Sequence, residues 1–330
     1  MVKSSSNTYV SVSFSGHQTF PLKLLWPYKV YHYFYENSKR ADKGLEAMLE
    51  LGLGSNMVSS AIFWSKAIGI IDSRHHVTSL GKLIFGTEET EGLDIYGEKI
   101  TTLYLYHWIL SRNSGICTTI CYLFNKFEKS IFTRDELKEA IKNEIDHLLE
   151  LRLIPKPISE NTINKDVDTI LRMYCPSNKD FGKLGTKLKD MRNQEEVAEY
   201  IFLPSNLIDF SDVNQQKFIL KRSRKEGLSA ELFAFCLLDF WTTVSEQLIS
   251  LDFEDIKSRQ TSPGMIFRLD DDSLHNYMTE LKDITDDLLE WSVQTGIRHV
   301  IYKGRESKSR CQEIEQLKQK LLVKALQNDN

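Results

Sequence analysis

Residues 41–86, ADKGLEAMLELGLGSNMVSSAIFWSKAIGIIDSRHHVTSLGKLIFG, decide the fold predicted for this chain. Their apolar spacing and turn residues predict a helix, a tight turn, a second helix and a short hairpin. That order is typical of a winged helix-turn-helix, a fold used mostly to bind nucleic acid. Such units also serve as dimerisation or packing modules, so this stretch alone leaves both uses open.

Local signals set the boundaries of this first helix pair. Asp42 is predicted to cap the first helix and Ser55 the second, because short polar side chains accept hydrogen bonds from free N–H groups at a helix start. Gly52 and Gly54 allow the left-handed backbone of a sharp turn. Helical spacing predicts an apolar inner face on the first helix made of Leu45, Met48 and Leu49.

The second helix and the hairpin loop are predicted to contact DNA. The outward side chains of this helix are small and uncharged, and those predicted to reach base edges are Asn56, Ser59 and Ser60. The loop from Ser73 to His76 is basic where a wing would lie. Arg74 and His75 are therefore predicted to contact phosphate.

A second helix pair is predicted from Thr133 to Tyr174. Thr133 and Glu136 match a capping box, and Ser159 is predicted to cap the following helix. The polar face of that helix holds the predicted DNA contacts Asn161, Asn164, Lys165 and Arg172. A solvated amphipathic helix explains the same pattern. Asp168 on that face would repel phosphate unless Lys165 or Arg172 pairs with it.

The composition is that of a soluble globular protein with room for two or three cores. The chain has 330 residues, of which 41% are hydrophobic and 27% charged, with a formal net charge of −4. That charge argues against a protein that coats DNA indiscriminately, but it allows a local basic patch. No secretion signal or membrane-spanning stretch is evident and the cysteines are scattered, so a cytoplasmic protein without membrane association is expected.

Three domains and a mainly helical α+β fold are predicted. Residues 1–99 hold the winged unit, residues 100–178 a buried helical pair and the second helix pair, and residues 179–330 a C-terminal α+β domain. In the last domain a hairpin is predicted over 288–302, and a final helix over 313–326 either closes the core or pairs two chains in a homodimer. Three clustered basic residues there are predicted to bind DNA: Lys221, Arg222 and Arg224.

Two further signals favour burial rather than chemistry. His107 lies inside an apolar helical pattern, which favours a hydrogen-bonded core histidine over a catalytic one. Cys117 and Cys121 lie one helical turn apart, but no second pair has metal-site spacing. Buried thiols are therefore expected at both positions.

Residues 15–29, SGHQTFPLKLLWPYK, combine residue types that rarely occur together without a functional reason. His17 and Gln18 are the candidate catalytic residues, since a histidine can move a proton and a glutamine can bond a base edge or a backbone group. Lys23 and Lys29 are predicted to add basic contacts with DNA. The competing interpretation is that His17 and Gln18 fix a strand-to-helix corner, with a helix starting near Thr19.

This segment resembles the opening motif of a bacterial family, a domain of unknown function found in single-strand DNA phosphorothioation (Ssp) defence operons. Further matches occur in the family's order, at 80–86, 106–110, 159–163 with 166–168, and 262–264 with 267–270. The resemblance implies a DNA-nicking component that acts with a cysteine desulfurase, an ATPase and a sulfur-transfer enzyme. The family pattern departs at Gln18, where glutamate is as readily expected.

The chemistry of strand nicking does not decide by itself whether a metal cofactor is needed. Hydrolysis of a phosphodiester usually needs a divalent metal such as Mg²⁺ or Mn²⁺ held by carboxylates, or a histidine base with a cation. No carboxylate-lysine nuclease motif stands out in the sequence. The alternative function is a non-catalytic DNA-binding or adaptor subunit that recruits the sulfur-modification enzymes. A small-molecule enzyme ranks last, because no phosphate loop or paired-acid motif is present.

Overall fold

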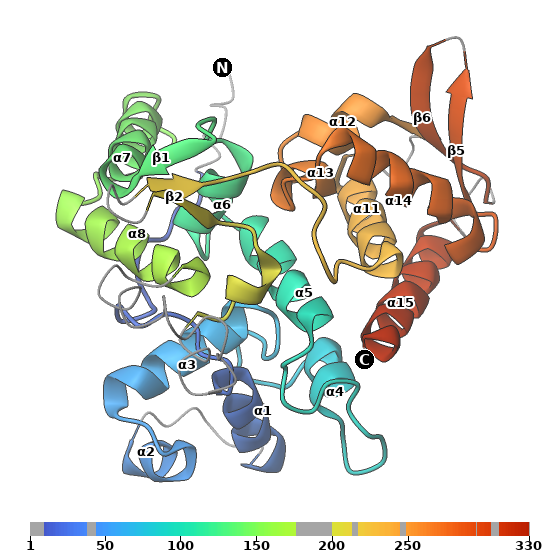
Figure 1. Ribbon diagram of the computed structural model, residues 1–330. Coiled ribbons are helices and arrows are strands. Elements are labelled where there is room, and N and C mark those ends of the chain that lie inside the picture. Colours follow the sequence, from blue (N-terminus) through green and yellow to red (C-terminus); the bar gives the residue numbers. More distant parts are fainter. Residues whose placement is uncertain are drawn as a thin grey trace, which may run out of the picture.

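The computed structural model describes residues 10–37, 44–175, 200–212, 217–244, 249–294, 296–304 and 310–329. The fold is α+β and mainly helical, as predicted, with two small antiparallel sheets. Figure 1 shows helices α1 to α4 at one end, α7 and α8 beyond them, and the C-terminal helices and hairpin to one side, with α5 running between the three groups. Among the helices described, none has the length and apolar character needed to cross a membrane.

The N-terminal group consists of four helices: α1 (Trp26–Asn37), α2 (Leu45–Leu51), α3 (Ser55–Ala67) and α4 (Ser79–Phe85). The prediction of a helix starting near Thr19 is wrong, because regular helix begins at Trp26. Pro27 therefore lies in the first turn, where its missing N–H costs nothing. Helix α4 was not predicted, although Thr78 caps it by accepting the N–H of Gly81.

The predicted inner face of α2 is right at Met48, which packs against the core, and wrong at Leu45 and Leu49. Leu45 and Leu49 are 70% and 72% exposed, whereas Ala47 and Leu51 are buried. Both pairs have the i, i+4 spacing of one helix face, so only packing against α1 and α3 decides between them. The predicted cap Asp42 lies outside the described residues.

The turn and the hairpin that follow match the prediction in part. Gly52 ends α2 in the left-handed region at φ 63°, but Gly54 is extended at φ −67°. The predicted cap Ser55 is wrong, because Ser55 is the first residue of α3 and Gly54 is the cap residue. The hairpin is reduced to a single antiparallel bridge between Ile71 and Val77. The Asp72 carboxylate accepts the backbone N–H groups of Arg74 and His76, and the bond from the His76 backbone is the main reason that its pKa is lowered.

The middle group is built on the predicted buried pair, α5 (Ile100–Ser111) and α6 (Thr118–Asn125). It continues through β1 (Ile131–Thr133), α7 (Arg134–Glu150) and α8 (Glu160–Tyr174) to the 3₁₀ helix η1 (Leu203–Ser205), β2 (Asp209–Asp212) and β3 (Lys217–Ile219). The predicted capping box at Thr133 and the predicted cap at Ser159 are both present. The sheet has strand order β1-β3-β2, so it joins segments from both sides of the domain boundary predicted at residue 178.

The C-terminal group contains five helices and a sheet. Its helices are α11 (Ala230–Val244), α12 (Phe253–Ser258), α13 (Pro263–Ile266), α14 (Asp271–Ile284) and α15 (Arg310–Asn328). The sheet pairs β4 (Ser250–Asp252) and β5 (Leu289–Gln294) with a central β6 (Ile297–Tyr302), and β5 and β6 are the predicted hairpin. Helix α15 packs along α11, which closes the core of this group.

His107 is a buried, hydrogen-bonded core histidine, as predicted, and its bonds join three parts of the core. Its Nδ1 lies 2.8 Å from the Tyr174 hydroxyl on α8, and its Nε2 lies 3.2 Å from the Ile266 carbonyl on α13. Since the carbonyl can only accept, the ring proton lies on Nε2 and Nδ1 accepts from the tyrosine. Burial lowers the pKa of His107 to about 3.

This lowered pKa makes stability depend on pH. In the unfolded chain a histidine takes up a proton near pH 6.5, whereas folded His107 does so only at about pH 3. The unfolding free energy is therefore expected to fall as pH drops below about 6.5, by about 1.4 kcal/mol per pH unit from this group. Urea unfolding at pH 7 and pH 5 measures the slope. The His107→Gln variant is expected to have a smaller slope, and an unchanged slope would contradict the assignment.

Candidate nucleic-acid interface

The loop Gly16–Phe20 lies between α3 and α8, and its His17 side chain is only 3% exposed. The Nε2 atom of His17 lies 2.6 Å from Oδ1 of Asp166 on α8, and the ring stacks on Trp64 of α3 with centroids 5.8 Å apart. The backbone N–H of Thr19 donates to Nδ1 at 3.1 Å. Nδ1 must therefore carry a lone pair, and Nε2 holds the proton that is donated to Asp166.

Backbone carbonyls of the same loop accept further bonds from both helices. Trp64 Nε1 donates to the carbonyl of Phe20 at 3.0 Å, and Arg172 Nη2 donates to the carbonyl of Thr19 at 2.8 Å. We call residues 16–20 with these partners the His17 clasp. It ties the opening motif of the chain to one helix of each predicted DNA-binding pair.

The clasp holds two residues in strained backbone conformations. Gln18 and Thr19 have φ angles of 49° and 63°, and both side chains are exposed. A positive φ is a true outlier for a β-branched residue such as threonine. Such strain persists only where the surroundings enforce it, and it is common at functional sites. Gly16 has φ 113°, and a Cβ there would lie 2.5 Å from the Phe63 ring.

On α3 the structure leaves part of the predicted DNA contact surface open. Asn56 is exposed and Ser59 is half-buried. The prediction for Ser60 is wrong, because this side chain is fully buried and its hydroxyl lies 3.5 Å from the Phe20 carbonyl. The clasp covers this side of α3, so a position that helical spacing assigns to solvent lies inside the molecule.

On α8 the predicted polar face is accessible. Asn161 and Lys165 are exposed, and Asn164 and Arg172 are half-buried. The carboxylate of Asp168 is paired, but with cations of α7 rather than with Lys165 or Arg172: Oδ1 lies 3.2 Å from Lys138 Nζ and 3.8 Å from Arg134 Nε.

The remaining predicted DNA contacts have mixed environments. Arg74 is exposed, while His75 is half-buried against Phe34 with ring centroids 5.2 Å apart. Lys23 and Lys29 are half-buried, and Lys29 Nζ donates to the Leu51 carbonyl at the end of α2 at 2.9 Å.

The basic cluster before α11 divides into surface and interior residues. Lys221 and Arg224 are exposed. Arg222 is half-buried: its Nη1 donates to the carbonyls of Gly264 and Leu269, both at 3.1 Å, and burial lowers its pKa. Its guanidinium therefore holds the α13 turn in place.

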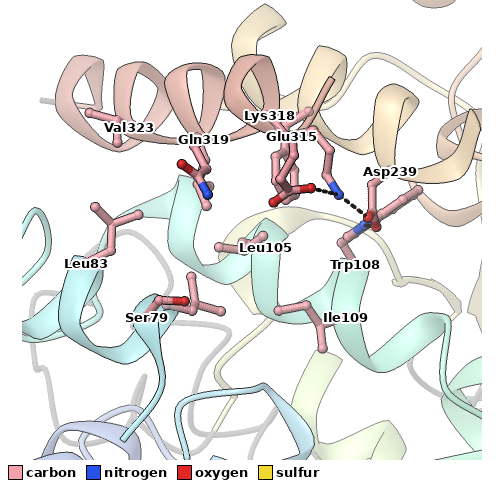
Figure 2. A pocket seen from close by; sticks show the side chains of 13 residues that line it. Ser79, Leu83, Leu105, Trp108, Ile109, Asp239, Glu315, Lys318, Gln319 and Val323 are labelled. Atoms are coloured by element: carbon pink, nitrogen blue, oxygen red, sulfur yellow. Dashed lines mark hydrogen bonds and ion pairs between the residues drawn. The ribbon is translucent and has the colours of Figure 1, made fainter. Parts of the chain in front are cut away.

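A second concave region lies away from the clasp. It is a cavity of about 520 Å³ between α4, α5, α11 and α15, lined mainly by apolar side chains such as Leu83, Leu105 and Trp108. Figure 2 shows its polar end, where Asp239 accepts the Trp108 indole N–H at 3.0 Å and pairs with Lys318 Nζ at 2.9 Å. These polar groups bond to one another, and Ser79 and Gln319 add polar side chains to an otherwise mainly apolar lining.

A model of the family described as "Protein of unknown function (DUF4007)" matches residues 14–318. The chain belongs to the DUF4007 family. Two solved structures are similar to this DUF4007 chain over nearly all its length. An SspB crystal structure has a TM-score of 0.75 at 20% identity, covering 96% of this chain and 90% of that one. A magnesium ion-bound SspB crystal structure has a TM-score of 0.73 at 21% identity, covering 94% and 88%.

At these identities the likeness to SspB shows a shared fold. No protein of curated function matches the DUF4007 chain. One of the two SspB structures is bound to a magnesium ion. Within the described part of this chain, no group of three or more His, Cys, Asp or Glu side chains is placed to hold a metal ion. We derive no chemical step through a metal.

Sequence reasoning missed Asp166, the partner of His17. The signal was available, because Asp166 lies among Ile163, Val167 and Ile170 on the apolar face of α8 and is only 2% exposed. A carboxylate in such a position needs a buried partner. Its charge acts on Cys117 as well: burial, and then Asp166, raises the pKa of that thiol, which is buried as predicted.

Breaking the clasp of the DUF4007 chain should be costly. The His17→Ala variant leaves the Asp166 carboxylate buried without its partner, so the unfolding free energy is expected to fall by about 3–5 kcal/mol. The double variant with Asp166→Ala should lose less than the sum of the single variants, since the two residues act as one unit. Denaturant unfolding of the full cycle measures both effects.

The matched control is an exposed histidine–aspartate pair. His76 Nδ1 lies 3.2 Å from Asp72, with the two side chains 73% and 43% exposed. The His76→Ala variant should remain close to the wild type, because solvent screens such pairs. Equal losses for His17→Ala and His76→Ala would contradict the role assigned to the clasp.

Proposed function

We propose that this DUF4007 protein binds duplex DNA and nicks one strand as a component of a DNA phosphorothioation defence system. The resemblance of residues 15–29 and the later motifs to the family of Ssp operons supports this assignment. The family match and the fold shared with SspB agree with that context. The partners implied are a cysteine desulfurase, an ATPase and a sulfur-transfer enzyme.

The observation that carries the proposal is the His17 clasp. Asn56 and Ser59 on α3 and Lys165 and Arg172 on α8 come from distant parts of the sequence, yet both helices are bonded to the same loop. A DNA-binding surface needs its polar and basic groups held in one rigid arrangement. The exposed, strained Gln18 lies between the two helices and is well placed to join such a surface.

We infer for His17 a positioning role rather than that of a proton acceptor. Both of its ring nitrogens are occupied, Nε2 by Asp166 and Nδ1 by the N–H of Thr19. A general base must have a lone pair within reach of the attacking group. For strand cleavage the chain supplies cations that stabilise the charge of a pentacoordinate phosphate, and Arg172 beside the loop is one of them.

A non-catalytic adaptor is the second candidate. The mainly apolar cavity between α4, α5 and α15 favours it, because a recruiting subunit needs a surface for a protein partner (Figure 2). In that case the protein binds DNA and the modification enzymes without cutting either strand.

Supercoiled plasmid distinguishes the two functions. Purified protein with Mg²⁺ or Mn²⁺ is expected to convert the plasmid to open circles, and a chelator tests whether the added metal is needed. The Gln18→Ala variant should slow the conversion while leaving the thermal unfolding midpoint near that of the wild type, since this side chain is exposed. Tight binding without conversion would reject the nickase and leave the adaptor.

The α8 face has its own test. The Asn164→Ala/Lys165→Ala double variant is expected to bind duplex DNA more weakly and with a salt slope lower by about 1, because one phosphate contact is lost. Fluorescence anisotropy over a series of salt concentrations measures both quantities. Lys303→Ala is the control, since this lysine pairs with Glu290 on the β5–β6 hairpin. An unchanged affinity and slope in the double variant would remove α8 from the interface.

A further inference from the structure

Asp168 on α8 is surrounded by cations from two helices. Lys138 Nζ and Arg134 Nε of α7 lie 3.2 Å and 3.8 Å from its Oδ1. Arg172, one turn further along α8, donates from Nε to the Asp168 backbone carbonyl at 3.3 Å. Two cations thus lie beside the carboxylate and a third bonds to the backbone of the same residue, and the four side chains together carry a net charge of +2.

The pairing inside this cluster is poor. The Nε of Arg134 and the Oδ1 of Asp168 are both buried atoms without a hydrogen-bond partner in the described part of the chain, although they face each other at 3.8 Å. That distance is too long for a hydrogen bond. A buried guanidinium N–H without an acceptor is costly, and an anion with more oxygens than a carboxylate can satisfy it.

The surroundings of the cluster suit a strand of nucleic acid. Arg172 also bonds to the His17 clasp, which presents the exposed side chains of Gln18 and Thr19. On the other side, Lys138 lines a cleft of about 430 Å³ between α7 and α8 that also contains Asn164. Asp135, Glu139 and Glu160 also line this cleft, and Glu160 is paired with Lys142 at 3.3 Å, so the cleft itself carries no excess of positive charge.

We propose that Arg134, Lys138 and Arg172 form a binding site for a backbone phosphate of DNA, and that Asp168 is an internal counter-ion which the phosphate replaces. This inference rests on the DNA binding proposed above, and these are the residues that would perform it. Asp168 is 42% exposed, so its carboxylate can turn into solvent when the phosphate arrives. A phosphodiester carries one negative charge, so its binding lowers the net charge at the four side chains from +2 to +1.

Substitutions of the cations and of the carboxylate in this cluster should change the affinity for DNA in opposite directions. Arg134→Gln and Lys138→Gln each remove one phosphate contact, so each is expected to weaken duplex binding about fivefold at 0.15 M salt and to lower the salt slope by about 1. Asp168→Asn removes the competing carboxylate, and it is expected to tighten binding by a similar factor. A merely structural role for Asp168 would predict weaker binding in this variant.

The experiment uses a fluorescein-labelled DNA duplex of mixed sequence and the full chain, with thermal unfolding of every variant as a check on folding. Arg298→Gln and Lys303→Gln are matched controls, since both side chains are partly exposed and ion-paired, with Glu254 and Glu290, in the C-terminal group. Arg134→Gln and Lys138→Gln test the site even if Asp168→Asn does not fold.

The outcomes separate the two proposals. This site is overturned if Arg134→Gln and Lys138→Gln bind the duplex as the wild type does, or if a folded Asp168→Asn variant binds it more weakly. Either result leaves DNA binding by the protein intact. A wild-type chain that binds no duplex overturns both. Weaker binding in the two α7 variants together with tighter binding in Asp168→Asn supports the site.

Discussion

The buried contact between His17 and Asp166 is the constraint on which the candidate surface depends. An ionised carboxylate that is 2% exposed is stable only with a donor beside it, and the imidazole Nε2–H supplies that donor at 2.6 Å. Because the same ring stacks on Trp64, one side chain sets the distance between α3 and α8. The two helices are therefore held in a fixed relation by the loop that carries His17.

Other polar contacts join the parts of the molecule in the same way. His107 links α5, α8 and α13, and Asp239 links α5, α11 and α15 through Trp108 and Lys318. Each is a polar group in an apolar setting, where an unmatched partner is costly and a wrong alignment is strongly disfavoured. The relative placement of the helix groups is thus specified by a few directional bonds in addition to close packing.

The DUF4007 match and the likeness to SspB establish the family and the fold. The proposed activity depends on how the surface around the clasp is charged. The whole chain carries a formal charge of −4, so DNA binding requires that cations be concentrated locally. Arg134 and Lys138 beside the Asp168 carboxylate, with Arg172 bonded to the Asp168 backbone, are such a local group of cations.

By itself the sequence determined the local features of this protein. The capping box at Thr133, the cap at Ser159, the polar face of α8 and the β5–β6 hairpin follow from hydrogen bonds and side-chain spacing within a few residues, and the structure contains them all. The burial of His107 was also predictable, because its apolar neighbours on the same helix already exclude water.

Only the tertiary structure decided which surfaces stay open. Ser60 is buried because the loop around His17 folds over it, and Arg222 is held by carbonyls more than 30 residues away in the sequence. The choice between the two possible faces of α2 and the pairing of Asp168 with α7 likewise depend on neighbours that no local pattern specifies. Spacing along a helix tells which side chains share a face, but the packing of other segments determines what that face meets.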